Sequence, residues 1–131
     1  MNTSTHTLAL NTTKANAFAF LADIENLPKW ATQFCRQLKT DAQGRRKVVT
    51  PNGEIYFRIV SDPTNGTIDM YGGPSQDQMA YWPARVVEWP GLGSLFIFTA
   101  MQYPGVSDAE FAAQCKGLSE EFVHIKKHIE Q

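Results

Sequence analysis

The chain has 131 residues, of which 43% are hydrophobic and 19% are charged, so it can build one sizeable core but not two domains of typical size. We therefore expect a single domain over residues 1–131. The formal net charge is -1, and the charges are scattered, which argues against a nucleic-acid partner because no broad basic surface is formed.

Membrane and secretion signals are missing from the sequence. Residues 1–7 are polar and lack the charged start and apolar core of a signal peptide, and no apolar run reaches membrane-spanning length. We expect a cytoplasmic protein without stable membrane insertion. In that setting its two cysteines, Cys35 and Cys115, are expected to stay unpaired.

The first part of the chain predicts a strand followed by two short helices. Residues 6–11 alternate between polar and apolar side chains, as in a strand. Residues 12–22 predict a helix capped by a threonine. A second helix is expected to begin at Pro28, which suits a first helical turn, and this helix can bury Trp30.

The middle of the chain predicts consecutive antiparallel strands, because turn signals recur roughly every eight to twelve residues. Pro83 lies inside one of these strands and requires an edge position or a bulge there, since proline has no backbone N–H. The expected strands are residues 36–40, 46–50, 55–60, 67–71, 78–88 and 94–102.

The last segment, residues 107–131, has the most regular pattern in the chain. Ser107 and Glu110 form a capping box at its start. A helix of about 22 residues spans roughly 33 Å, the width of a small domain. Its apolar residues are separated alternately by four and three positions, which places them on one side of a helix: Phe111, Cys115, Leu118, Phe122, Ile125 and Ile129.

These elements predict an α+β fold. A curved antiparallel sheet of six to seven strands wraps around the long C-terminal helix, with two short helices after the first strand. Such a sheet cannot close tightly on a helix of that diameter. We therefore expect an apolar cavity between the sheet and the helix.

Three stretches resemble one known family. They are residues 17–30 (AFAFLADIENLPKW), Phe98-Thr99, and residues 107–111 (SDAEF). With the order of elements, they look like the helix-grip fold of the START-like, or SRPBCC, superfamily, which includes polyketide cyclase/dehydrase-like and birch-pollen-allergen-like proteins. The likeness extends over about residues 6–129. It implies an elongated cavity for a hydrophobic small molecule such as a lipid, but it is poorly specific for activity.

The polar side chains near Pro83 leave two strand registers open. In one, Tyr81 and Arg85 face the cavity, where they could orient a carboxylate- or ketone-bearing ligand or act in catalysis. In the other, Trp82 and Val86 face inward and Arg85 faces solvent.

The expected ligand-binding residues occupy the positions that the predicted elements turn inward. They are Leu8, Leu10, Trp30, Phe57, Met70, Tyr81, Arg85, Phe111, Cys115, Leu118 and Phe122.

Other polar clusters have simpler interpretations. His124 and His128 are four apart on the long helix, a spacing that can hold a metal ion, but no third ligand is evident and we expect no metal site. Asp23 and Glu25 could form an acid/base pair, although capping of the neighbouring helix is the favoured interpretation. No nucleophile motif or dinucleotide loop is present, and we expect no cofactor.

Three functions remain open. The leading hypothesis is a monomeric or homodimeric binder of a small hydrophobic or aromatic molecule. The second is a polyketide cyclase/dehydratase-like enzyme that uses the same cavity, with Arg85 and Tyr81 as candidate catalytic residues. The third is a protein-interaction module with a filled core.

Overall fold

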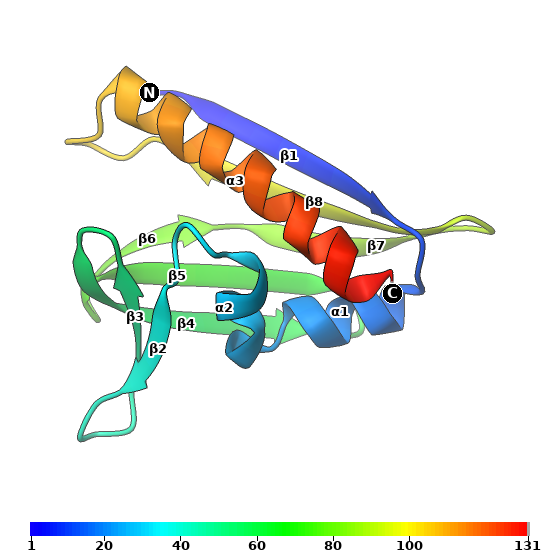
Figure 1. Ribbon diagram of the computed structural model, residues 1–131, viewed down its shortest axis with the longest axis horizontal. Helices are drawn as coiled ribbons and strands as arrows, with labels where there is room; N and C mark the ends of the chain where they lie inside the picture. The colour runs from blue at the N-terminus through cyan, green and yellow to red at the C-terminus, as the bar shows by residue number, and fades with distance from the viewer. Residues whose placement is uncertain (131) are drawn as a thin grey trace.

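The computed structural model describes residues 1–130 and shows a curved antiparallel sheet crossed by one long helix (Figure 1). This arrangement confirms the predicted α+β architecture. Its elements are β1 (Thr3–Leu10), α1 (Lys14–Leu21), the 3-10 helix η1 (Ile24–Asn26), α2 (Leu27–Trp30), β2 (Gln37–Thr40), β3 (Arg46–Thr50), β4 (Gly53–Asp62), β5 (Thr67–Ser75), β6 (Gln78–Trp82), β7 (Ala84–Trp89), β8 (Gly93–Met101) and α3 (Asp108–Ile129).

The sheet has eight strands in the order β1-β8-β7-β5-β4-β3-β2, with β6 paired to β5 beside this path. One strand more is present than predicted because Pro83 divides the expected strand 78–88 into β6 and β7. Trp82 pairs with Met70 on β5, whereas Ala84 pairs with Phe98 on β8. Proline cannot donate to a strand ladder, so the chain changes its partner at this residue.

Helix α3 begins with the predicted capping box between Ser107 and Glu110. Most of its predicted apolar stripe is buried, whereas Cys115 and Ile129 are only half-buried. Two positions outside that stripe, Gly117 and Glu121, are buried as well. Residue 131, the last of the predicted helical segment, lies outside the described residues.

Both ends of α3 are tied to the start and end of β1, which runs beside the helix (Figure 1). At the N-terminal end, the side chain of Gln102 donates to Asp108 Oδ1 (2.9 Å) and accepts from Asn2 Nδ2 (2.9 Å). At the C-terminal end, Lys126 Nζ donates to the Ala9 carbonyl (3.0 Å) and Asn11 N donates to the Glu130 carboxylate (2.6 Å). The helix is therefore fixed along the sheet at two separate places.

The short helices fold as their capping residues predict. Thr13 caps α1 by accepting a hydrogen bond from Asn16 N (3.1 Å). Asp23 caps η1 by accepting from Glu25 N (3.0 Å), which confirms the capping interpretation for this carboxylate. The helices α1 and α2 contact α3, so all three lie on the same face of the sheet (Figure 1).

The main core lies where the three helices meet the sheet. Leu21 on α1, Leu27 on α2 and Phe96 on β8 are each at most 2% exposed. Cys35 is buried and Cys115 half-buried, and both are free thiols. Among residues 1–130, no helix combines the length and the hydrophobicity that crossing a membrane requires.

Candidate functional site

A cavity of about 550 Å³ lies beneath α3, between α2 and the inner face of the sheet. This volume falls within the range of small-molecule sites, roughly 300–1,000 Å³. Most of its wall is apolar and comes from α2, the strands and the middle of α3: Leu27, Trp30, Phe34, Ile55, Phe57, Met70, Trp82, Phe98 and Leu118.

Aromatic rings form one side of this cavity. Phe34, Phe57 and Trp82 surround a common point, with ring centroids 5.5 Å (Phe34–Phe57), 6.0 Å (Phe34–Trp82) and 6.3 Å (Phe57–Trp82) apart. Trp30 packs edge-on against Phe96 at 6.4 Å. Such rings have few rotatable bonds and present broad flat surfaces, which suits a planar apolar ligand.

The mouth of the cavity is lined by exposed residues from three segments. They are Gln33 after α2, Pro51 and Asn52 in the turn between β3 and β4, and Ala113 and Gln114 on the first half of α3. A ligand can therefore reach the apolar interior by passing between the β3–β4 turn and the helix.

Glu121 places a carboxylate in this apolar wall. The residue is 5% exposed, and its Oε2 atom accepts hydrogen bonds from the backbone N–H groups of Gln33 (2.9 Å) and Phe34 (3.0 Å). Burial raises the pKa of Glu121 above its ordinary value, and the two backbone hydrogen bonds offset part of that rise. No cationic side chain among the described residues forms an ion pair with it.

A glycine in α3 leaves room for the side chain of Gln33 beside these hydrogen bonds. A Cβ atom on Gly117 would lie 2.7 Å from Gln33 Oε1. The Gln33 side chain instead lies across Gly117 and donates from Nε2 to the carboxylate of Glu120. The contact between α2 and α3 is thus built from Gly117, Gln33 and Glu121 together.

Trp30 has a buried polar atom beside the same cavity. Its side chain lines the cavity and is 2% exposed, yet its Nε1 atom is buried without a hydrogen-bond partner among the described residues. Buried N–H groups are nearly always paired in folded proteins. This N–H group is enclosed by protein atoms, so a ligand in the cavity does not reach it.

Four of the predicted ligand-binding residues, Trp30, Phe57, Met70 and Leu118, line the cavity. The remaining apolar ones lie elsewhere: Leu10, Phe111 and Phe122 are buried in the packed core, and Leu8 and Cys115 are half-buried outside the cavity wall. Phe122, for instance, packs against Phe96 and Phe98 with ring centroids 5.5 and 6.4 Å away.

Tyr81 and Arg85 lie on the other face of the sheet, so the structure removes both candidate catalytic residues from the cavity. The Tyr81 hydroxyl donates to Asp69 Oδ1 (2.9 Å), and this hydrogen bond, with burial, raises the pKa of Tyr81 to about 12. Arg85 is exposed, and its Nε donates to the Asn65 carbonyl (2.9 Å). The observed register is the one that turns Trp82 inward.

Sequence reasoning missed Glu121 as a site residue. A signal for it is present, because Gln114, Gly117 and Glu121 repeat at intervals of three and four and so form a second stripe beside the apolar one. A glycine within such a stripe indicates close approach of another segment. This second stripe lines the cavity.

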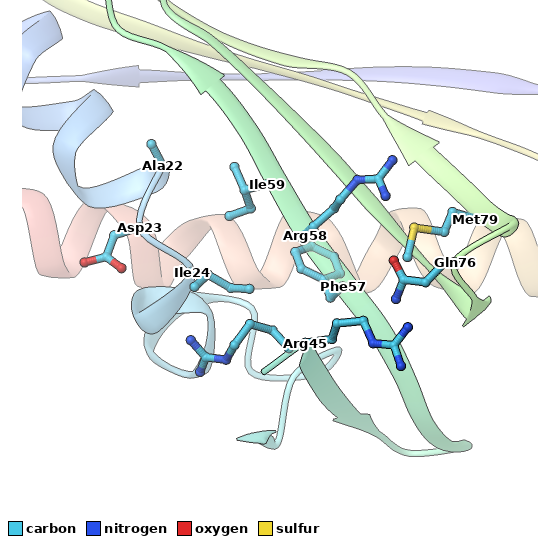
Figure 2. Close-up of a pocket in the computed structure, with 10 residues that line it drawn as sticks. Ala22, Asp23, Ile24, Arg45, Phe57, Arg58, Ile59, Gln76 and Met79 are labelled. Carbon is cyan, nitrogen blue, oxygen red and sulfur yellow. The ribbon is translucent and has the colours of Figure 1, made fainter. Parts of the chain in front are cut away.

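A second hollow, of about 460 Å³, lies along β4 beside η1, with side chains from η1, β4 and the β5–β6 segment (Figure 2). Its arginines already have partners. Arg46 pairs with Glu25, Arg45 Nε lies 3.2 Å from Asp41 Oδ2, and the Arg58 guanidinium lies 4.8 Å from the centre of the Tyr71 ring. We therefore take the cavity beneath α3 as the candidate site.

One of the two histidines on α3 packs against an aromatic ring. The ring of His128 stacks on Phe20 with centroids 5.8 Å apart. Among residues 1–130, no group of three or more histidine, cysteine, aspartate or glutamate side chains is arranged to hold a metal ion.

Comparison with known proteins identifies a fold rather than a relative. No family model matches the sequence, and no curated protein matches it. Among solved structures, an uncharacterised protein from Bacillus thuringiensis is 17% identical, with a TM-score of 0.75 and coverage of 99% of this chain and 100% of that one.

Two further structures have informative names. Ara h 8.0201 is 14% identical, with a TM-score of 0.64 and coverage of 98% of this chain and 97% of that one. The di-domain ARO/CYC protein BexL from the BE-7585A biosynthetic pathway is 12% identical, with a TM-score of 0.68; the match covers 99% of this chain and 47% of BexL. At these identities the likeness is one of fold alone, and it shows that the chain adopts a helix-grip fold.

Proposed function

We propose that this protein binds a small apolar or aromatic molecule in the cavity beneath α3. The observation that carries the proposal is a cavity of about 550 Å³ with aromatic walls and a mouth at the protein surface. An interaction module with a filled core, the third hypothesis from the sequence, would need a solid interior at this place.

The size of the cavity sets the affinity to expect. Burying roughly 300 Å² of ligand surface contributes about 7 kcal/mol at about 25 cal/mol per Å², and association costs at least about 4 kcal/mol. At most about 3 kcal/mol remains, so the apolar surface of a ligand of two fused rings should by itself give a dissociation constant no tighter than a few millimolar, and hydrogen bonds would lower it. Larger ligands that fill the mouth as well should bind more tightly.

Native mass spectrometry of gently purified protein tests the proposal. We expect retention or uptake of at least one member of lipid, polyketide and isoprenoid panels. Leu118→Trp should block uptake by filling the cavity, whereas Val123→Trp, at a position 65% exposed on the same helix, should not. If no panel member binds, or if both variants bind as well as the wild type, the proposal is wrong.

A cyclase/dehydratase-like activity is the second candidate, and Glu121 is the observation that favours it. Burial raises the pKa of Glu121, which makes it better suited than an exposed glutamate to exchange a proton with a substrate held in a dry pocket. The fold likeness to the ARO/CYC protein BexL is consistent with this role. Glu121→Gln should then abolish product formation from a poly-β-ketone substrate while binding persists; unchanged turnover would exclude Glu121 as the acid.

A further inference from the structure

Only one of the two carboxylate oxygens of Glu121 accepts a hydrogen bond from the described residues. Oε2 accepts both backbone hydrogen bonds, from Gln33 and Phe34, while Oε1 accepts none from the described residues. Because Glu121 lines the cavity, this free oxygen is available to a molecule inside it. It is the one carboxylate oxygen that the cavity wall offers.

Such an oxygen favours a hydrogen-bond donor. A buried carboxylate without a cationic partner loses the hydration that stabilises its charge, and a donor from the ligand restores part of what water supplied. An anionic ligand group would instead meet a like charge in an apolar setting. Glu121 therefore selects against carboxylates and for N–H or O–H groups.

The aromatic wall narrows the class of ligand further. The aromatic rings nearby favour a flat apolar body on the same molecule.

We propose that the cavity binds a ring-containing molecule with an O–H or N–H group, for example an alcohol or a phenol, that donates to Oε1 of Glu121. This inference rests on the proposed ligand-binding function and deepens it. The rings of Phe34, Phe57 and Trp82 contact the apolar body, and the donor group defines which way the ligand is oriented.

Three compounds of similar size test the inference: 2-naphthol, 2-methylnaphthalene and 2-naphthoate. Titration at pH 7, followed by ligand fluorescence, should rank 2-naphthol at least about tenfold tighter than 2-methylnaphthalene, as one hydrogen bond to a charged group implies. The carboxylate 2-naphthoate should bind most weakly. Equal binding of all three, or tightest binding of 2-naphthoate, overturns the inference and leaves the proposed function standing.

Substitutions test whether Glu121 causes the expected order of affinities among the three compounds. Glu121→Gln keeps a carbonyl for the two backbone N–H groups and should reduce the preference for 2-naphthol to within about twofold. Glu88→Gln makes the same charge change at an exposed position on β7 and should leave the preference unchanged. A preference for 2-naphthol that persists in Glu121→Gln refutes the assignment.

The two proposals fail in different ways. If none of the three compounds binds to the folded wild-type protein, the ligand-binding function itself is contradicted at this ligand size. If 2-methylnaphthalene binds but 2-naphthol gains nothing over it, the cavity is a site without the proposed selectivity. Circular dichroism of each variant confirms that it is folded before its binding is compared.

Discussion

Replacing Glu121 by leucine tests whether its carboxylate holds the α2 loop against α3. The substitution removes the acceptor of two backbone N–H groups, those of Gln33 and Phe34. An unsatisfied buried donor costs about 1–3 kcal/mol. Two effects reduce this cost. Gln33 is exposed and Phe34 half-buried, so water can reach part of the loop that carries the two N–H groups. The substitution also removes a negative charge that burial destabilises. We expect a net loss of about 2 kcal/mol, which lowers the Tm by roughly 5–10 °C.

The control is Glu121→Gln, measured by urea denaturation between pH 4 and 8. Because the folded-state pKa of Glu121 lies above the ordinary value of 4.5, the native state binds more protons than the unfolded state just above pH 4.5. Wild-type stability should therefore fall, relative to this variant, as pH rises through the window between the two pKa values. At pH 7 the glutamine variant should be at least as stable as the wild type.

Two results would refute this reasoning. If Glu121→Leu is as stable as Glu121→Gln at pH 7, the two backbone hydrogen bonds do not support the fold. If wild-type stability instead rises with pH relative to the glutamine variant, the charged form of Glu121 is the favoured one. In that case the backbone N–H groups outweigh burial, opposite to the direction argued above.

Three further predictions concern other residues. Gly117→Ala should stabilise the protein by up to about 1 kcal/mol in thermal denaturation, because alanine favours the helix and the end of the flexible Gln33 side chain can move away; a loss above about 1 kcal/mol contradicts this. Tyr81→Phe and Arg85→Ala should leave ligand affinity within about twofold in titrations, since both residues face away from the cavity. The Cys35 thiol, whose pKa burial raises to about 11, should resist iodoacetamide at pH 8 while the half-buried cysteine on α3 is alkylated, as mass spectrometry would show; equal labelling would disprove it.

The fold could be predicted from the sequence because its main signals are local and repeated. The apolar stripe of α3 follows directly from helical periodicity, and its capping box is encoded in four consecutive residues. The structure around Pro83 could not be predicted from such local signals. A missing N–H is compatible with a bulge, an edge or a break, and only the positions of β5 and β8 determine that the chain changes partners there.

The candidate site was less predictable because it depends on contacts between distant segments. Trp30, Phe57 and Leu118 could be found, since apolar residues at inward positions line whatever space remains. Glu121 could not be found in the same way, because a glutamate beside an apolar stripe normally faces water. Its burial is decided by the backbone of residues 33–34, which lies nearly ninety positions away and donates two hydrogen bonds to it.

The double attachment of α3 determines how a ligand can get in. Hydrogen bonds at Asp108 and at Lys126 hold both ends of the helix against neighbouring strands, so the rod cannot swing outward from either end without breaking them. The loop at Gln33 is likewise held to the helix by Glu121. The turn between β3 and β4, which also borders the mouth, has side-chain hydrogen bonds only within itself. Movement of this turn, while the long helix stays in place, is the motion that would let a ligand enter and leave.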